Sequence, residues 1–255
     1  MKILSAIAAL SCLAFTSANA SLLTIHDGAG TIGTVETTTG VATVSSTAAV
    51  FTDIAYAADG TLYAIDFENL YTVDPMTGAT TLIGAHGVPG GNALVFGSDG
   101  TLYAHGFATT FVYSLNTTTG AGSAIGDTGY ASAGDLAFVG DVLYLSTGTD
   151  DLITIDTTSG AGALVGAIGF ANVYGLATDP STNTLFGLTG LTLLSINAAT
   201  GAGTALFDLS GQGFTSIFGT TFFGEAGEVP IPGAFLLMAT ALAGFGASRR
   251  KGVKN

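Results

Sequence analysis

The feature that most constrains this chain is an internal repeat of about forty residues. A Thr-Gly or Ser-Gly pair recurs with its glycine at positions 40, 78, 120, 160 and 201, at spacings of 38, 42, 40 and 41. Similar apolar and turn residues surround each copy, and Phe51–Ala64 followed by Leu70–Gly84 is the fullest one. A fixed period of this kind is typical of folds in which each unit buries its apolar face against its neighbours.

Each repeat has the pattern of four short β-strands. Runs of β-branched, aromatic and aliphatic residues alternate with turn residues, and no segment of helical period stands between residues 21 and 228. Four strands at a period near forty is the pattern of a β-propeller blade. We therefore predict an all-β domain over residues 21–224, a β-propeller of about five four-stranded blades. Its complete units span residues 52–84, 92–126, 134–166 and 173–207.

The remaining segments of the repeat region complement each other. Phe214–Gly224 resembles the first half of a unit, with Phe222 and Phe223 in the place of a recurring Leu-Tyr pair, and residues 31–44 resemble the second half. Joining the two halves predicts a fifth blade built from both ends of the chain, which closes the ring and leaves no unpaired inner edge. A larger ring that uses Leu22–Ile25, or an open stack, is the alternative.

Two kinds of hairpin loop punctuate the repeats. Asp59-Gly60 and Asp99-Gly100 fit tight type I′ turns, which need positive φ at both central residues. The pattern from Asp74 to Gly78 predicts a longer loop, in which the Asp side chain accepts hydrogen bonds from the loop backbone and the glycine is left-handed. The same pattern recurs at residues 116–120, 156–160 and 197–201.

Charge is distributed very unevenly along the chain. Residues 21–228 contain no Lys or Arg and all 18 acidic residues, which gives this span a formal charge of −18. Nucleic acid and anionic lipid surfaces are excluded as partners because both are bound through cationic side chains. For a chain of high mean hydropathy, the negative charge also favours solubility.

The first twenty residues have the pattern of a secretory signal peptide. Lys2 precedes an apolar run from Ile3 to Phe15, and Ala18-Asn19-Ala20 is a small-residue site for signal peptidase, with Ser21 the first mature residue. The only cysteine, Cys12, lies in this leader, so the mature chain has no disulfide. Cleavage before Cys12, as in a lipoprotein, is the alternative.

The C-terminal region has three parts. Residues 225–232 form a linker that ends in Val229-Pro230-Ile231-Pro232, residues 233–247 are apolar, and residues 248–255 contain Arg249, Arg250 and Lys251. An apolar run of this length is short for a stable membrane span, which needs about 20 residues. Basic residues after the run stay on the cytoplasmic side by the positive-inside rule. The sequence predicts a transient stop in the inner membrane.

This tail resembles the PEP-CTERM sorting signal of Gram-negative bacteria, in the variants that begin Val-Pro-x-Pro. The match covers residues 229–251, and Ile231 stands where the commonest form has Glu. The resemblance implies recognition by an exosortase-type processing enzyme, removal of the tail, and delivery to the cell surface or the extracellular biofilm matrix. A plain C-terminal membrane anchor is the alternative.

Few residues suggest chemistry. No nucleophile elbow, zinc-binding His pair, phosphate-binding glycine loop or Cys pair is present, and His26, His86 and His105 are isolated in the sequence, where hydrogen-bonded or exposed histidines are expected. Asp53 and Asp135 precede the first strand of their units, where the other units place Ala93, Gly175 and Ser216. These two aspartates are either structural caps or ligands of a weak Ca²⁺ site at the tunnel mouth.

Two functions fit this pattern. We expect a noncatalytic cell-surface or matrix protein whose propeller binds an exopolysaccharide or a surface protein. The alternative is a secreted metal-dependent hydrolase or lactonase, which needs about four converging acidic, amide or imidazole side chains at one tunnel mouth. The recurring Tyr63, Tyr103 and Tyr144 are expected to pack between blades and not to form a sugar-stacking platform.

Overall fold

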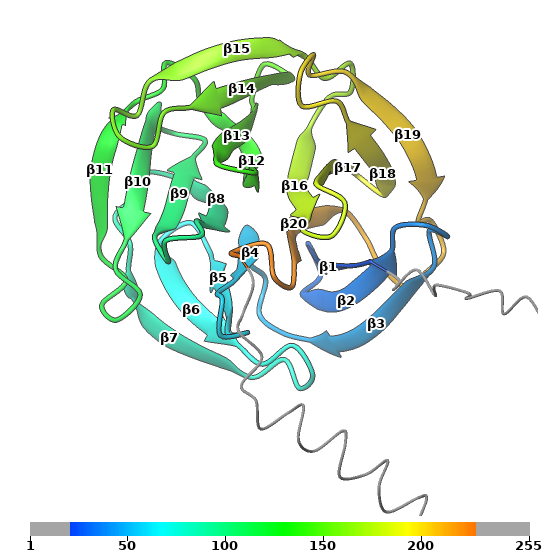
Figure 1. Ribbon diagram of the computed structural model, residues 1–255. Helices are drawn as coiled ribbons and strands as arrows, with labels where there is room; N and C mark the ends of the chain where they lie inside the picture. Colours follow the sequence, from blue (N-terminus) through cyan, green and yellow to red (C-terminus); the bar gives the residue numbers. More distant parts are fainter. Residues whose placement is uncertain (1–20, 228–255) are drawn as a thin grey trace, which may run out of the picture.

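The computed structural model describes residues 21–227, which form a five-bladed β-propeller (Figure 1). Five four-stranded antiparallel sheets surround a central axis, and each sheet runs from an inner strand to an outer one. The predicted all-β ring of five blades is confirmed. Within the described span, no helix is long and apolar enough to cross a membrane. The predicted signal peptide at 1–20 and the predicted sorting tail from residue 229 onward lie outside the described residues.

Four blades each use one continuous stretch of the chain. Blade 1 consists of β4 (Asp53–Tyr56), β5 (Leu62–Ile65), β6 (Asn69–Val73) and β7 (Thr80–Ala85). Blade 2 consists of β8 (Gly91–Phe96), β9 (Leu102–Gly106), β10 (Phe111–Leu115) and β11 (Gly122–Asp127). Blade 3 consists of β12 (Ser132–Val139), β13 (Val142–Thr147), β14 (Asp151–Ile155) and β15 (Gly162–Ala167). Blade 4 consists of β16 (Val173–Asp179), β17 (Thr184–Thr189), β18 (Thr192–Ile196) and β19 (Gly203–Asp208).

The fifth blade, which we call the closing blade, joins the two ends of the chain. Its inner strand is β20 (Ile217–Phe222), followed by β1 (Leu22–Asp27), β2 (Thr31–Glu36) and β3 (Ala42–Thr47). β20 and β1 are antiparallel, and Leu23 pairs with Phe222. The predicted closure is therefore confirmed. Because this pairing seals the ring, residues 21–227 form a self-contained folding unit.

The division of strands in the closing blade differs from the expected one. The C-terminal segment supplies one strand and the N-terminal segment three, whereas two from each end were expected. Leu22–Ile25, which the alternative with a larger ring would have used, lies in the second strand of the closing blade. Leu23 and Ile25 are fully buried there against blade 4. Phe223 does not occupy the place of the recurring tyrosine, since it follows the inner strand and is exposed.

The five inner strands contact one another in the order β4, β8, β12, β16, β20 and back to β4. We call the face where these strands begin the upstream face, and the face where they end the downstream face. The pairing of Leu23 with Phe222, the last residue of β20, places the start of β1 at the downstream face. Both ends of the described chain therefore lie on the same face of the ring.

Asp and Asn side chains fix the longer loops as predicted. The Oδ1 atom of Asp74 accepts hydrogen bonds from the backbone N–H groups of Met76 at 2.8 Å and Thr77 at 3.2 Å. The N–H of Gly78 donates to the Asp74 carbonyl, and the φ angle of Gly78 is +73°. The loops that begin at Asn116, Asp156 and Asn197 repeat this arrangement.

The two shorter Asp-Gly turns are not of type I′. Gly60 and Gly100 have φ of +88° and +84°, but neither preceding aspartate has positive φ. The N–H of Gly60 donates to the carbonyl of Ala57, and the Asp59 carboxylate accepts the N–H of Thr61. Type I′ turns need two positive-φ residues, so these hairpins are type I turns followed by a left-handed glycine.

The outer strands meet the loops of the next blade through glycines. Each blade has a register shift between its third and fourth strands. Gly84, near that shift, lies against the carbonyl of Thr119 in the next blade, and Gly126 lies likewise against Ser159. A Cβ atom at either glycine would overlap the carbonyl oxygen. This close approach explains the glycine at this position in blades 1, 2 and 3, at Gly84, Gly126 and Gly166.

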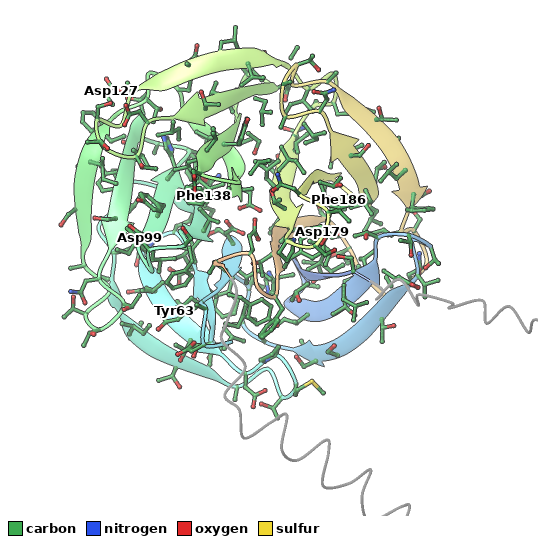
Figure 2. The ribbon with its side chains drawn as sticks, viewed as in Figure 1. Tyr63, Asp99, Asp127, Phe138, Asp179 and Phe186 are labelled. Atoms are coloured by element: carbon green, nitrogen blue, oxygen red, sulfur yellow. The ribbon has the colours of Figure 1, made fainter. Side chains whose placement is uncertain are left out.

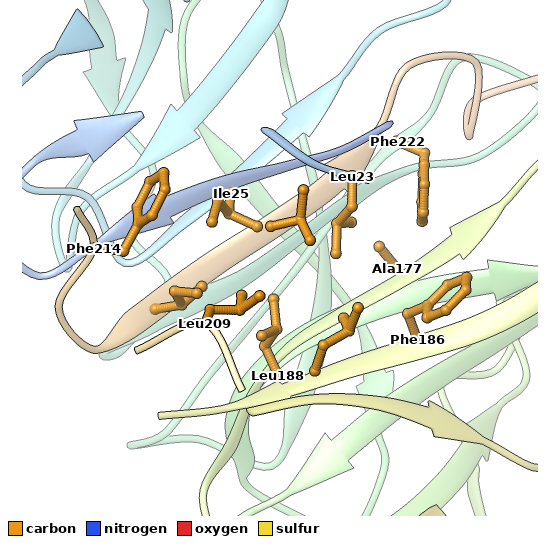
Figure 3. Close-up of a cluster of buried hydrophobic side chains, with 11 residues drawn as sticks. Leu23, Ile25, Ala177, Phe186, Leu188, Leu209, Phe214 and Phe222 are labelled. Atoms are coloured by element: carbon orange, nitrogen blue, oxygen red, sulfur yellow. The ribbon is translucent and has the colours of Figure 1, made fainter. Parts of the chain in front are cut away.

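The hydrophobic core lies between neighbouring blades. Figure 3 shows the cluster that joins the closing blade to blade 4, with Leu23 and Ile25 from β1 beside Leu188 from β17. The recurring tyrosines pack in such interfaces, since Tyr103 and Tyr144 are buried and Phe186 fills the same place in blade 4 (Figure 2 labels Phe186). The expected packing role of this position is confirmed.

Candidate functional site

Two aspartates connect inner strands across the centre of the ring. Asp53 is fully buried; its Oδ1 accepts the N–H of Ile54 at 2.7 Å, and its Oδ2 accepts the N–H of Leu94, on the next inner strand, at 2.5 Å. Backbone groups at this inner edge have no neighbouring strand, so the carboxyl group takes the place of a ladder partner.

Asp135 repeats this arrangement between blades 3 and 4. Its Oδ1 accepts the N–H of Leu136 at 2.7 Å, and its Oδ2 accepts the N–H of Leu176 at 2.6 Å. The hydroxyl of Thr220, on the closing blade, also donates to Oδ2 at 3.0 Å. Asp135 therefore connects three blades at the axis.

The equivalent positions in the other inner strands are small. Ala93 and Gly175 stand there as predicted, but the closing blade supplies Gly219 and not Ser216, because Gly219 pairs with the second strand as Ala93 does. A Cβ atom at Gly219 would lie 2.9 Å from Oδ1 of Asp53. The small residues leave room for two carboxyl groups on the axis.

Burial raises the pKa of both aspartates well above the usual range. The charge of Asp135 and a side-chain hydrogen bond with it raise the pKa of Asp53 further. Both carboxyl groups are therefore harder to ionise than exposed aspartates.

The downstream end of the axis is closed by the turn that follows β20. Glu225 accepts hydrogen bonds from the backbone of Thr178 at 2.9 Å and of Phe222 at 3.2 Å, and from the hydroxyl of Thr221 at 3.3 Å. Burial raises the pKa of Glu225 to about 8. Ala226 is also buried, in the core cluster of blades 1 and 2. The propeller therefore extends beyond residue 224, into the segment predicted to be a linker.

The three histidines are buried and hydrogen-bonded. His86 donates to the carbonyl of Asp66 at 3.0 Å and accepts the N–H of Val88 at 3.0 Å. His105 accepts the N–H of Gly106 at 2.8 Å, and burial lowers the pKa of His105 to about 4. His26 contacts the carbonyl of Ala49 at 3.0 Å, and burial also lowers its pKa. Buried histidines with local hydrogen-bond partners have the structural role expected for them.

A pocket opens at the upstream face. Its volume is about 300 Å³, and every blade contributes to its wall. Thr52, Asn92, Gly134, Tyr174 and Phe218 occupy the same repeat position, directly before the axial aspartate position, and all line the pocket. The remaining lining residues are Phe67, Phe107 and Ala133.

Asn92 is the most unusual residue of this pocket. Its side chain is 8% exposed, and its Nδ2 donates to the carbonyl of Ala133 at 2.9 Å. Its Oδ1 is buried without a hydrogen-bond partner. An unsatisfied buried acceptor costs about 1–3 kcal/mol, so a donor that reached Oδ1 of Asn92 would relieve this cost.

The aromatic residues of the pocket form two edge-to-face pairs. Phe67 and Phe107 lie 5.5 Å apart between ring centroids, and Tyr174 and Phe218 lie 6.0 Å apart. Phe67 and Phe107 occupy equivalent loops of blades 1 and 2, and each is 54% exposed. Exposed aromatic rings that gather over a pocket are typical of a binding surface.

Sequence reasoning did not identify this pocket. The signal available was the recurrence of Phe67 and Phe107, each four residues after a recurring tyrosine and inside a hairpin loop, where large apolar residues are unusual. Asn92 and its counterparts carry five different side chains at one repeat position, so comparison of the repeats conceals their common location.

The axial aspartates lie beneath the pocket wall and make the hydrogen bonds of structural caps. Among residues 21–227, no three His, Cys, Asp or Glu side chains are placed to hold a metal ion. A Ca²⁺ site at Asp53 and Asp135 stays a prediction. The hydrolase alternative needs about four converging polar groups, and the described upstream mouth brings together Asn92 and Thr52.

The remaining predicted site residues lie at the two ends of the chain. Ser21 is described, and its carbonyl accepts the N–H of Thr37 at 3.1 Å. The other residues of the predicted cleavage site, Ala18 and Ala20, lie outside the described residues, as do the sorting-signal residues Val229, Pro230, Ile231, Pro232, Arg249, Arg250 and Lys251.

Comparison with known proteins supports the fold. No protein-family model and no curated protein sequence matches the chain. A chain in the crystal structure of a nidogen–laminin complex is similar over 79% of this chain and 97% of its own length, with 14% identity and a TM-score of 0.54. A structural genomics protein of unknown function from Bacteroides thetaiotaomicron VPI-5482 is similar over 82% and 66%, with 16% identity and a TM-score of 0.54.

A third similar structure comes from work on the de novo evolutionary emergence of a symmetrical protein. It matches over 78% of this chain and 93% of its own length, with 17% identity and a TM-score of 0.50. At these identities the likeness concerns the fold alone. Fold and pocket together define the described chain as a five-bladed β-propeller module with a cavity at one mouth of its axis.

Proposed function

We propose that this chain is an exported, noncatalytic protein whose propeller binds a polysaccharide or a protein of the cell surface or extracellular matrix. One observation carries the proposal: the upstream face has an aromatic pocket with an unpaired buried acceptor, while both ends of the described chain lie on the downstream face. A pocket opposite the chain ends stays accessible when the protein is held by either end.

The targeting part of the proposal rests on the sequence at the two ends. A signal peptidase removes residues 1–20, and the tail from Val229 onward anchors the protein briefly in the inner membrane until an exosortase-type enzyme removes it. Gly227, the last described residue, lies beside Ser98 at the downstream face. The tail therefore leaves the propeller on the side away from the pocket, where a membrane enzyme reaches it without covering the pocket.

Mass spectrometry of the protein isolated from the outside of its native host tests the targeting. We expect a mature chain that begins at Ser21 and ends upstream of Arg249. An external protein that still carries Arg249, Arg250 and Lys251 would overturn processing of the tail.

A pull-down with immobilised residues 21–227 tests the binding. We expect a polysaccharide or a surface protein from the envelope fraction of the native host to be retained above the level of a blank resin. Retention of no envelope component would overturn the proposed binding function. The acidic surface requires a comparison at low and high salt, because charge-driven adsorption of cationic material decreases with ionic strength.

A further inference from the structure

The upstream pocket excludes charged ligands. Its lining consists of Thr52, Asn92, Ala133, Gly134 and the four aromatic residues, so no carboxylate, imidazole, Lys or Arg lines the cavity. The described residues contain no Lys or Arg that would neutralise an anion, and the negative charge of the domain repels one. A cation finds no carboxylate in the lining, because the axial aspartates are fully buried. The pocket therefore suits a neutral ligand.

The size of the pocket limits that ligand to about one ring. A cavity of about 300 Å³ is at the lower end of the range for ligand pockets, which is about 300–1,000 Å³. The pocket is open at the propeller surface, so a longer chain can continue beyond it after one unit has entered.

The two aromatic pairs favour a ligand that has a flat apolar face. Phe67 and Phe107 form one edge-to-face pair, and Tyr174 and Phe218 form the other. An aromatic ring has a negative face, which attracts weakly positive C–H groups. A pyranose ring presents such C–H groups on its faces and hydroxyl groups around its edge.

Asn92 favours a ligand that also has a hydrogen-bond donor at its edge. Its Nδ2 donates one hydrogen bond to the carbonyl of Ala133, and its buried Oδ1 has no partner. A sugar hydroxyl supplies the missing donor. A site built to bond a hydroxyl group discriminates strongly against ligands that lack it, because its own polar group then stays unpaired.

We propose that the upstream pocket binds one neutral sugar unit of a polysaccharide, with an apolar face of the ring on the aromatic pairs and a hydroxyl donating to Oδ1 of Asn92. This inference rests on the proposed binding function and assigns its ligand class. Blades 1 and 2 determine which sugar the pocket selects, because only their loops place a phenylalanine, Phe67 or Phe107, at this position. The other three blades have glycine there, at Gly148, Gly190 and Gly28.

Isothermal titration of residues 21–227 with cellohexaose, mannohexaose, an alginate hexamer and a neutral hexapeptide tests this proposal. We expect one of the neutral hexasaccharides to bind, and the alginate hexamer and the peptide not to bind. Phe107→Ala is expected to weaken that binding about 10-fold, the effect of losing roughly 1.4 kcal/mol. Asn92→Ala is expected to weaken it by at least the same factor.

Phe223→Ala is the matched control. Phe223 is 60% exposed and lies against Tyr56 at the downstream face, so its loss removes a ring of similar exposure without touching the pocket. The control is expected to bind sugar like the unchanged protein. Circular dichroism of each variant verifies that it is folded, and Phe107→Ala, whose ring is half exposed, provides the test if Asn92→Ala fails to fold.

The outcomes separate this inference from the proposed function. Envelope polysaccharide retained equally by Phe107→Ala and the unchanged protein would overturn the pocket as the site and leave the binding function standing. Binding of the alginate hexamer or the peptide alone would overturn the neutral-sugar class. If neither neutral hexasaccharide binds and the pull-down also retains no envelope component, the proposed binding function itself is overturned.

Discussion

The two ends of the propeller axis are built from the same repeat and have opposite chemistry. At the downstream end, Glu225 accepts three hydrogen bonds and Ala226 is packed in the core. At the upstream end, aromatic rings remain exposed and Oδ1 of Asn92 lacks a partner. A polar group fully satisfied by its own chain contributes to stability, whereas one left unpaired at a cavity is available to a ligand.

The largest expected effect concerns the aspartate that connects three blades below the pocket. Asp135→Ala removes the acceptor for the buried N–H groups of Leu136 and Leu176, and we expect it to lower the free energy of unfolding by about 3–5 kcal/mol. Urea denaturation measures this change. Asp135→Asn, which keeps the shape of the carboxyl group and one acceptor oxygen, is expected to cost less.

Asp141→Ala provides the control for this comparison, because Asp141 is exposed at the downstream face and surface substitutions change stability by less than about 0.5 kcal/mol. A loss below about 1 kcal/mol in Asp135→Ala would contradict the structural role of the axial carboxyl groups.

The second prediction concerns the pH dependence of the downstream plug. Burial raises the pKa of Glu225 from 4.5 to about 8, so its contribution to stability is fully present below pH 4.5 and is lost as the pH rises through about 8. Relative to Glu225→Gln, the unchanged protein is expected to lose about 3 kcal/mol of unfolding free energy between pH 4.5 and pH 7.

Denaturant unfolding at a series of pH values gives the difference between these two proteins. Glutamine also loses one hydrogen-bond acceptor, but that loss shifts the whole curve by a constant amount, so the slope is the informative quantity. Parallel curves for the two proteins would show that Glu225 is not buried as a neutral acid.

The smallest expected effect sharpens the contrast between the two faces. Phe107→Ala and Phe223→Ala each remove a ring that is more than half exposed, and we expect each to change the unfolding free energy by less than about 1 kcal/mol. Thermal or urea unfolding measures both. A much larger loss for Phe107→Ala would assign that ring to the core and weaken its role in binding.

Repetition made most of the fold predictable. The Asp74–Gly78 type of loop was correct in blades 1 to 4 because one side chain and one glycine determine it locally. The division of strands in the closing blade was not predictable in the same way. Thr24 stands there where other blades have Tyr or Phe, so the match to the repeat is lost and only the partner strand defines the register.

The site was less predictable than the fold. Asp53 and Asp135 were expected just before the inner strands, at the tunnel mouth, but they lie within β4 and β12 and are fully buried. The room for Asp53 depends on Gly219, from the far end of the chain. Asn92 could be identified as a candidate only from the structure, because its unpaired oxygen results from how the blades pack around the pocket. Residues that act together across blades stand about forty positions apart and share no local pattern.

The order of strands in the closing blade also affects the synthesis of the protein. A ribosome releases β1 first, but the partner that covers its inner edge, β20, is the last strand of the described chain to be made. Until then the nascent ring stays open, and contacts between such distant segments form slowly. A truncated translation product that ends before Ile217 lacks this closure and presents free strand edges, which makes incomplete molecules distinguishable from finished ones to proteases and chaperones.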